Sequence, residues 1–132
     1  MGSFTTTYSE TILDQLVGTD APFLALFTAS PGDSGAVTDE VSASGYDRQD
    51  ISADWEAAGG TNPREVNTNA EISFAKATET WGTISHLALC AAVTEGVQDL
   101  KIWGALTNPK TIESGDQLIF SAGNITISVA AG

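Results

Sequence analysis

The chain has 132 residues, 42% of them hydrophobic, and its 17 acidic and 5 basic residues give a net charge of −12. A chain of this length forms one domain with a buried core. Five scattered basic side chains cannot bind a nucleic acid backbone, and no apolar window is long enough to cross a membrane, so both kinds of partner are excluded. The single cysteine cannot form an internal disulfide, which fits folding in a reducing cytoplasm.

The opening stretch predicts a short amphipathic helix over about residues 8–17. Thr7 and Glu10 have the spacing of a capping box, and Gly18 stands where a left-handed residue commonly ends a helix. The apolar residues form one stripe, Ile12, Leu13, Leu16 and Val17. Because so short a helix is unstable alone in water, we expect the stripe to dock on the rest of the domain or on another copy.

A predicted inner strand and a long loop come next. Residues 22–28 are apolar on both faces, whereas residues 30–50 are rich in turn formers and have little periodicity. A loop of that length in a compact domain commonly serves as an arm or a binding loop. A surface loop without a function is the alternative, and the sequence leaves both open.

Residues 81–92 form the longest apolar-rich run. Alternate residues supply two largely apolar faces, one with Ile84, His86, Ala88 and Cys90 and the other with Ser85, Leu87, Leu89 and Ala91. This pattern predicts a central strand that is covered on both sides. His86 is then expected to be a hydrogen-bonded core or interface residue, and Cys90 a buried small hydrophobe.

Several short extended segments complete the pattern, at about residues 51–55, 65–74, 100–106, 110–112, 117–120 and 124–129. Turn signals separate them, and within 65–74 the side chains of Val66, Thr68, Ala70, Ile72 and Phe74 are predicted to share one face. No later segment has helical periodicity. The sequence therefore predicts a single, mainly β domain over residues 1–132, an antiparallel β-sandwich or jelly roll with one short N-terminal α-helix.

The residues do not suggest a catalytic or cofactor site. The only histidine, His86, lies among leucines in a predicted strand, and one histidine with one cysteine cannot supply the ligands of a transition-metal site. The acidic residues match no calcium loop, although a calcium ion at the acidic long loop stays open. We therefore expect a non-enzymatic protein without a cofactor.

Three tryptophans, Trp55, Trp81 and Trp103, adjoin turn-rich sequence. Each can close one end of a sandwich while its indole N–H reaches a carbonyl. Alternatively, one of them, together with Tyr46, is an aromatic anchor at a protein interface or a platform for a sugar ring.

A series of segments follows the N-terminal helix in a distinctive order: 23–28, the Pro-Gly-Asp loop at 31–33, 45–49, 72–74, 80–86 and 103–110. The most particular are Trp-Gly-Thr-Ile-Ser-His at 81–86 and Trp-Gly-Ala-Leu-Thr-Asn-Pro-Lys at 103–110. In this series the chain resembles small phage virion structural proteins of the head decoration (cement) and tail-fibre-like group. The resemblance implies a β-rich virion component that works by assembly, commonly as a homotrimer.

Within this group we expect a decoration protein that binds the major capsid protein and copies of itself and stabilises the head shell. The long loop and the N-terminal arm offer reach to a neighbour, whereas so short a chain leaves little room for both an attachment domain and a fibre shaft. The alternatives are a tail fibre or tail-tip protein for host attachment, and a carbohydrate-binding module for a host-surface glycan.

The contact residues predicted for such an assembly are Phe4, Leu13, Leu16, Tyr46 and Arg48. The guanidinium of Arg48 is suited to bidentate contacts with an acidic neighbour. The alternative for Arg48 is a surface salt bridge within its own loop, to Asp47 or Asp50.

Overall fold

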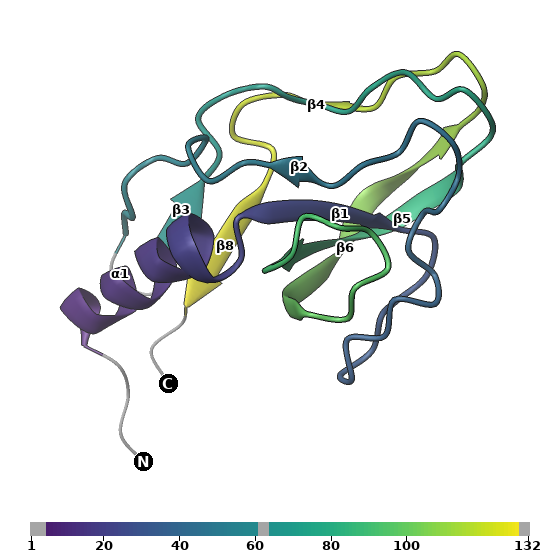
Figure 1. Cartoon of the computed structure of the whole chain (residues 1–132). Helices are drawn as coiled ribbons and strands as arrows, with labels where there is room; N and C mark the ends of the chain where they lie inside the picture. Colours follow the sequence, from purple (N-terminus) through teal and green to yellow (C-terminus); the bar gives the residue numbers. More distant parts are fainter. Residues whose placement is uncertain (1–4, 61–63, 130–132) are drawn as a thin grey trace.

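The computed structural model describes residues 5–60 and 64–129 (Figure 1). A short helix, α1 (Thr6–Gln15), leads into a π-helical turn, η1 (Leu16–Asp20). The strands are β1 (Phe23–Phe27), β2 (Gln49–Asp50), β3 (Arg64–Asn67), β4 (Ile72–Ser73), β5 (Gly82–Cys90), β6 (Leu100–Ile112), β7 (Ile119–Phe120) and β8 (Thr126–Val129). In the described residues, no helix is long and apolar enough to cross a membrane.

The helix exists as predicted, but its two ends differ. The N-cap is Thr5, whose hydroxyl accepts a hydrogen bond from the N–H of Tyr8 at 3.2 Å, so Thr7 and Glu10 do not form the predicted capping box. Gly18 does not end the helix in a left-handed conformation. It lies inside η1, where the N–H of Ala21 donates to the carbonyl of Leu16 at 2.8 Å and widens the last turn.

The largest sheet has four strands in the order β2-β1-β5-β6, all antiparallel to their neighbours. The run at 81–92 supplies β5, which lies between β1 and β6, and the run at 22–28 supplies β1, which lies between β2 and β5. The predictions of a central strand and an inner strand are therefore confirmed. The predicted strand at 51–55 is wrong by a few residues, because the chain pairs with β1 at Gln49 and Asp50 and turns away after Ile51.

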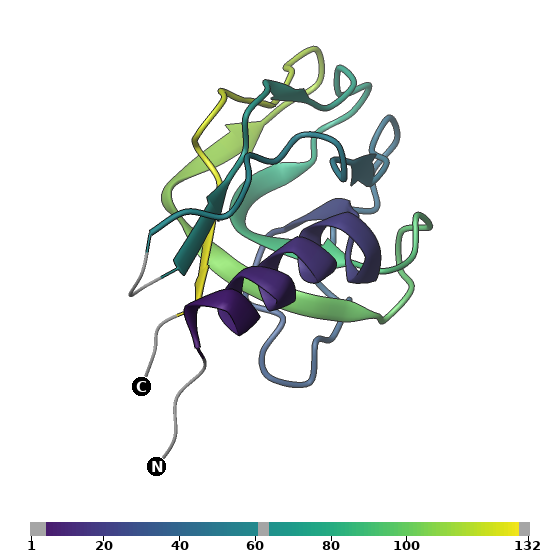
Figure 2. The ribbon, with the colours of Figure 1, turned by 90° about the vertical axis from the view of Figure 1, so that its left-hand side faces the viewer.

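Two smaller antiparallel ribbons, β3–β8 and β4–β7, make up the rest of the β structure. The predicted alternation over 65–74 holds, since Val66, Thr68, Ile72 and Phe74 are buried. The single predicted strand is nevertheless divided, and β3 and β4 pair with different partners. The helix lies across the ribbon side of the molecule (Figure 2), where it packs on β3 and β8.

The core lies on both sides of the four-stranded sheet. On one side, residues of the sheet pack against the helix and the two ribbons; they include Leu24, Leu26, Ile84, Leu89, Leu13, Val17, Val66, Ile127, Phe74 and Phe120. On the other side is a smaller cluster of Ala25, Phe27, Ala88 and Cys90, covered by Val37 of the long loop and by Leu100. The mainly β fold with antiparallel sheets and one short N-terminal helix is thus confirmed, and Cys90 is buried as predicted.

Candidate functional site

The second half of the long loop is held inside the molecule by Arg48. Its guanidinium makes a bidentate pair with Glu40, from Nε to Oε2 and from Nη2 to Oε1, both at 2.8 Å. Both side chains are almost completely buried, with exposed fractions of 0% and 2%. Loop residues Glu40, Val41, Tyr46 and Arg48 are buried, so this half of the loop is anchored in the domain by part of its side chains.

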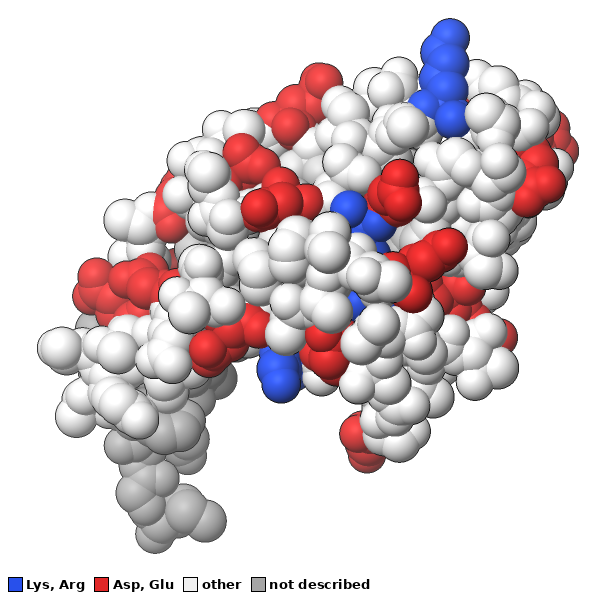
Figure 3. Space-filling view, in the orientation of Figure 1, with Lys and Arg blue, Asp and Glu red and all other residues white. Residues whose placement is uncertain are grey.

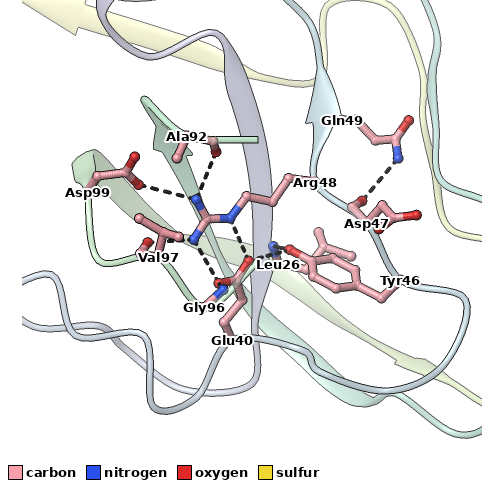
Figure 4. A network of polar contacts seen from close by, with 10 residues as sticks. All are labelled: Leu26, Glu40, Tyr46, Asp47, Arg48, Gln49, Ala92, Gly96, Val97 and Asp99. Carbon is pink, nitrogen blue, oxygen red and sulfur yellow. Dashed lines mark hydrogen bonds and ion pairs between the residues drawn. The ribbon is translucent and has the colours of Figure 1, made fainter. Parts of the chain in front are cut away.

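Arg48 also joins this loop to the β5–β6 connection (Figure 4). Its Nη1 donates to the carbonyl of Ala92 at 2.9 Å and to the carboxylate of Asp99 at 3.2 Å, and its Nη2 donates to the carbonyl of Val97 at 2.8 Å. The N–H of Gly96 in turn donates to Glu40 Oε1 at 2.8 Å. The network fixes the connection that leads into β6.

Tyr46 ties the same network to β1. Its hydroxyl donates to Glu40 Oε2 at 2.8 Å and accepts from the N–H of Leu26 at 3.1 Å. Its ring stacks on Phe74 and meets the edge of Trp81. The loop, the sheet and the aromatic part of the core are thereby connected through one side chain.

Opposing effects set the charge states of this network. Burial by itself raises the pKa of the Glu40 carboxyl, but the hydrogen bonds from Arg48, then from the Gly96 N–H and the Tyr46 hydroxyl, outweigh it, and the pKa lies below the ordinary glutamate value. Burial by itself lowers the pKa of Arg48, yet its hydrogen bonds to Glu40 leave the pKa raised. Burial, followed by the charge of Glu40, raises the pKa of Tyr46. Glu40 and Arg48 are therefore an ion pair at neutral pH.

Acidification is expected to remove the contribution of this pair to stability. An unfolded glutamate titrates near about pH 4.3, and Glu40 titrates lower in the folded chain, so the unfolded state binds more protons in between. The difference in unfolding free energy between the native chain and Glu40→Gln should be full above about pH 5 and shrink as the pH falls through the folded pKa. Urea unfolding over this pH range measures the difference. The exposed variant Glu56→Gln corrects for the loss of one negative charge, and a pH-independent difference after that correction would contradict the prediction.

The structure places most of the predicted contact residues in the interior. Leu13, Tyr46 and Arg48 are buried, with exposed fractions of 0%, 4% and 3%, Leu16 is partly buried, and Phe4 lies outside the described residues. Contacts of these residues with another chain stay predictions, which for the buried three require the side chains to leave the core.

The helix stripe was predicted to dock on the rest of the domain or on another copy, and the structure shows the first of these, since Leu13 and Val17 join the main core. One detail of the predictions for Arg48 is corrected. Arg48 does not pair with Asp47 or Asp50 at the surface, because folding brings Glu40 and Asp99 to its buried guanidinium. The guanidinium does make a bidentate contact, but its acidic partner Glu40 lies in the same chain, and a contact with a neighbouring chain stays a prediction.

Strand β6 is one of the two edge strands of the four-stranded sheet. The carbonyls of Pro22 and Leu26 bond away from β5, to Ile51 and Val41. The backbone groups of successive residues in an antiparallel strand point in opposite directions, so residues 23, 25 and 27 of β1 bond to β5. The same alternation in β5 directs the backbone groups of residues 87 and 89 to β6. Their partners in β6, residues 104 and 102, bond back to β5. The N–H and C=O groups of Trp103 and Ala105 consequently point outward from the sheet, and both residues are exposed.

A bulge limits this free edge. Ile84 pairs with Lys110 and His86 pairs with Ala105, so residues 106–109 lie opposite the single residue Ser85. The turn predicted between segments 100–106 and 110–112 is thus an irregularity within one strand, β6. A second shift in register lies at Lys101, because Leu89 pairs with Ile102 whereas Cys90 pairs with Leu100. Residues 102–105 therefore form the regular part of the edge.

A groove of about 370 Å³ runs beside this edge. It lies between β6 and the segment that enters β8, and it is lined by Leu24 and residues 87–89, 102–107 and 124–128. None of the lining residues is charged. On a chain with a net charge of −12, this is an uncharged surface of mixed apolar and polar residues.

The three tryptophans have different surroundings. Trp81 is buried, and its indole N–H donates to the carbonyl of Ser44 at 3.2 Å, as predicted for a ring that closes one end of the domain. The indole N–H of Trp55 is buried without a hydrogen-bond partner among residues 5–60 and 64–129. Trp103 is 37% exposed on β6, and its ring centroid lies 5.8 Å from that of His86. His86 is partly buried and hydrogen-bonded to Ser85 at 2.8 Å.

Charge is distributed unevenly over the chain. Figure 3 shows acidic side chains across the face in view, with the few basic ones set apart from each other. By contrast, β6 contains two lysines, Lys101 and Lys110, and no acidic residue. In the described part of the chain, histidine, cysteine and acidic side chains form no group of three or more that could hold a metal ion.

Sequence reasoning missed Glu40 and Asp99 as partners of Arg48, and it missed the free edge of β6. A chain with 17 acidic residues carries no spacing rule that selects the partner of one arginine. For the edge a weak signal existed, since 100–112 combines β-forming residues with lysines and lacks acids.

Comparison with known proteins gives one result that bears on identity. Residues 3–128 match the family model described as podophage GP4 fiber I protein gp80. No curated protein matches the chain. Because the match spans nearly the whole sequence, the chain belongs to this phage fibre protein family and is a structural component of the virion.

Proposed function

We propose that this chain is a structural component of the phage tail fibre and works by assembling with other chains, without catalysing a reaction. The observation that carries the proposal is the family match over residues 3–128, whose description names a fibre protein. The match favours a tail fibre over the capsid decoration expected from the sequence. If the chain were a capsid decoration protein instead, its partner would be the major capsid protein.

The surface of the chain supports a role in assembly. An uncharged groove runs beside a strand edge whose backbone groups at Trp103 and Ala105 point outward. Strand edges of this kind bind other chains by extending the sheet. The buried ion pair between Arg48 and Glu40 holds the connection into this strand, so the edge is presented on a rigid support.

Immunogold electron microscopy of intact phage particles tests the location, with an antibody raised against this protein. We expect gold particles at the tail. Particles that lack the gene for this chain are the matched control, and they should bind no gold. Gold spread over the head would overturn the tail fibre proposal in favour of decoration, and an absence of gold from all particles would contradict a virion location.

A further inference from the structure

We propose that the groove beside β6 receives an extended segment of a different virion protein, which pairs as a strand with the free edge of β6 and anchors this chain in the particle. The pairing rests on the assembly role proposed above and specifies its site and its partner. The partner segment is about five residues long and carries uncharged, apolar side chains at the alternate positions that face the groove.

One border of the groove is the free edge of β6. The N–H and C=O groups of Trp103 and Ala105 point away from β5, and both residues line the groove. In the sheet order β2-β1-β5-β6, no strand of the described residues lies beyond this edge. These backbone groups are therefore available to a strand from another chain.

The other border belongs to β8, whose free side follows from the bonds of β3. The N–H and C=O groups of Glu65 bond to those of Gly59, both at 2.7 Å, and so point away from β8. Because these directions alternate along a strand, the neighbouring Val66 bonds to β8, and its partner Ile127 bonds back to β3. The residues on either side of Ile127 consequently direct their backbone groups away from β3.

These two residues, Thr126 and Ser128, line the groove, whereas no residue of β3 does. The groove thus lies on the side of β8 that faces away from β3. It separates two strand edges, on β6 and β8, whose outward backbone groups pair with no other strand of the described residues. A strand placed in the groove pairs with β6 along one side and presents its other side to β8.

The floor of the groove has room for side chains from an added strand. Gly104 lines it, has no positive φ, and has nothing within 4 Å of a Cβ built on it, so neither its conformation nor its packing requires a glycine. The backbone groups of Gly104 bond to β5, so its neighbour in an added strand forms a close, non-hydrogen-bonded pair and places its side chain over Gly104. The aliphatic residues around this position are Leu24, Leu87, Leu89, Ile102, Leu106 and Ile127.

The lining determines the chemistry of the occupant. It has no charged residue, so a charged side chain that entered the groove would be buried without a partner. A sugar chain would find no ring to stack on. The only aromatic residue of the lining, Trp103, has its ring beside His86, on the face of the sheet opposite Leu87 and Leu89.

A folded second copy of this chain is also unsuited to the groove. Every described strand already has a partner in its own sheet, so none is free to enter. The occupant is therefore a segment of a different protein.

Photo-cross-linking in intact phage particles identifies the occupant. Benzoylphenylalanine replaces Thr107, which is exposed and lines the groove, and mass spectrometry of the product reads the attached segment. We expect a segment of a different virion protein, with no charged side chain at the alternate positions that face the groove. The same reagent in place of Ile119, which is exposed on β7 outside the groove, is the control and should not attach to that segment.

Variants of the groove test whether it anchors the chain. Phage that lack the gene are grown in hosts that supply the native or a variant chain, and mass spectrometry measures the amount of the chain in purified particles. Gly104→Val should reduce this amount at least about tenfold, because the valine fills the space for the side chain of the partner. Gly59→Val is the matched control, since Gly59 is also exposed, has no positive φ and has nothing within 4 Å of an added Cβ. It should enter particles at the native level.

Amide hydrogen exchange of the isolated chain, with a synthetic peptide of the cross-linked segment, tests the register. The N–H groups of Trp103 and Ala105 should exchange freely without the peptide and become protected with it, whereas the N–H of Gly104 bonds to β5 and should be protected in both states. In Gly104→Val the peptide should give no protection at concentrations that saturate the native chain. Should Gly104→Val not fold, Ala105→Pro serves instead, because it removes an outward N–H that no internal bond uses.

Three results would overturn the groove as the anchor. One is the absence of any attached protein segment, including particles in which a sugar chain attaches instead. The second is attachment to a second copy of this chain alone. The third is native incorporation of both Gly104→Val and Ala105→Pro, with the native circular dichroism spectrum. The tail location fails on a different measurement, gold spread over the head, which leaves the result for the groove standing.

Discussion

Replacement of Arg48 by methionine is expected to lower the free energy of unfolding by about 3 to 5 kcal/mol, as is typical when one partner of a buried ion pair is removed. The guanidinium makes five hydrogen bonds, two to Glu40 and three to Ala92, Val97 and Asp99. Without it, the Glu40 carboxylate stays buried with a net charge and without its cation. Urea unfolding of the native and variant chains measures the loss.

A matched control is Arg64→Met, which removes the other ion-paired arginine. Arg64 pairs with Glu10 at 2.8 Å, but the two side chains are 17% and 42% exposed, so the expected loss from the pair is about 0 to 1 kcal/mol. Equal losses of unfolding free energy for the two variants would contradict the prediction that a buried ion pair costs more to break than an exposed one. A double variant, Arg48→Met with Glu40→Gln, should be less destabilised than the sum of the two single variants, because it leaves neither charge buried.

Replacement of Phe74 by alanine is the second large effect, with an expected loss of about 3 to 5 kcal/mol. Phe74 is 1% exposed and contacts two other rings, with its centroid 6.2 Å from that of Tyr46 and 6.4 Å from that of Trp81. The truncation leaves a cavity in the main core and removes both ring contacts. Because Trp81 is one of the two adjacent rings, its fluorescence should also change in the folded state.

The exposed residue Ile119 provides the control for this change. Its side chain is 45% exposed on β7, so Ile119→Ala leaves no comparable cavity and should change the unfolding free energy by about 0.5 kcal/mol or less. A loss for Phe74→Ala no greater than that of the control would show that the three rings do not form a rigid part of the core. Urea unfolding followed by tryptophan fluorescence measures both variants.

Local patterns in the sequence were sufficient to predict several helices and strands of the fold. Both faces of residues 22–28 and 81–92 are apolar, and a strand of that kind is stable only where both faces are covered, so β1 and β5 were predictable as inner strands. The alternation over 66–74 identified which side chains would be buried, and the amphipathic stripe identified the helix. These properties depend on the periodicity of neighbouring residues, which the chain carries by itself.

The tertiary structure decided which distant groups meet. Arg48 was recognisable as a residue suited to a bidentate contact, but its partners Glu40 and Asp99 follow from the path of two loops, which no local spacing encodes. The division of one predicted strand into β3 and β4 likewise came from their separate partners, β8 and β7. The free edge of β6 and the neutral groove exist only because the sheet ends there, and strand order is set by long-range packing that the sequence pattern does not report.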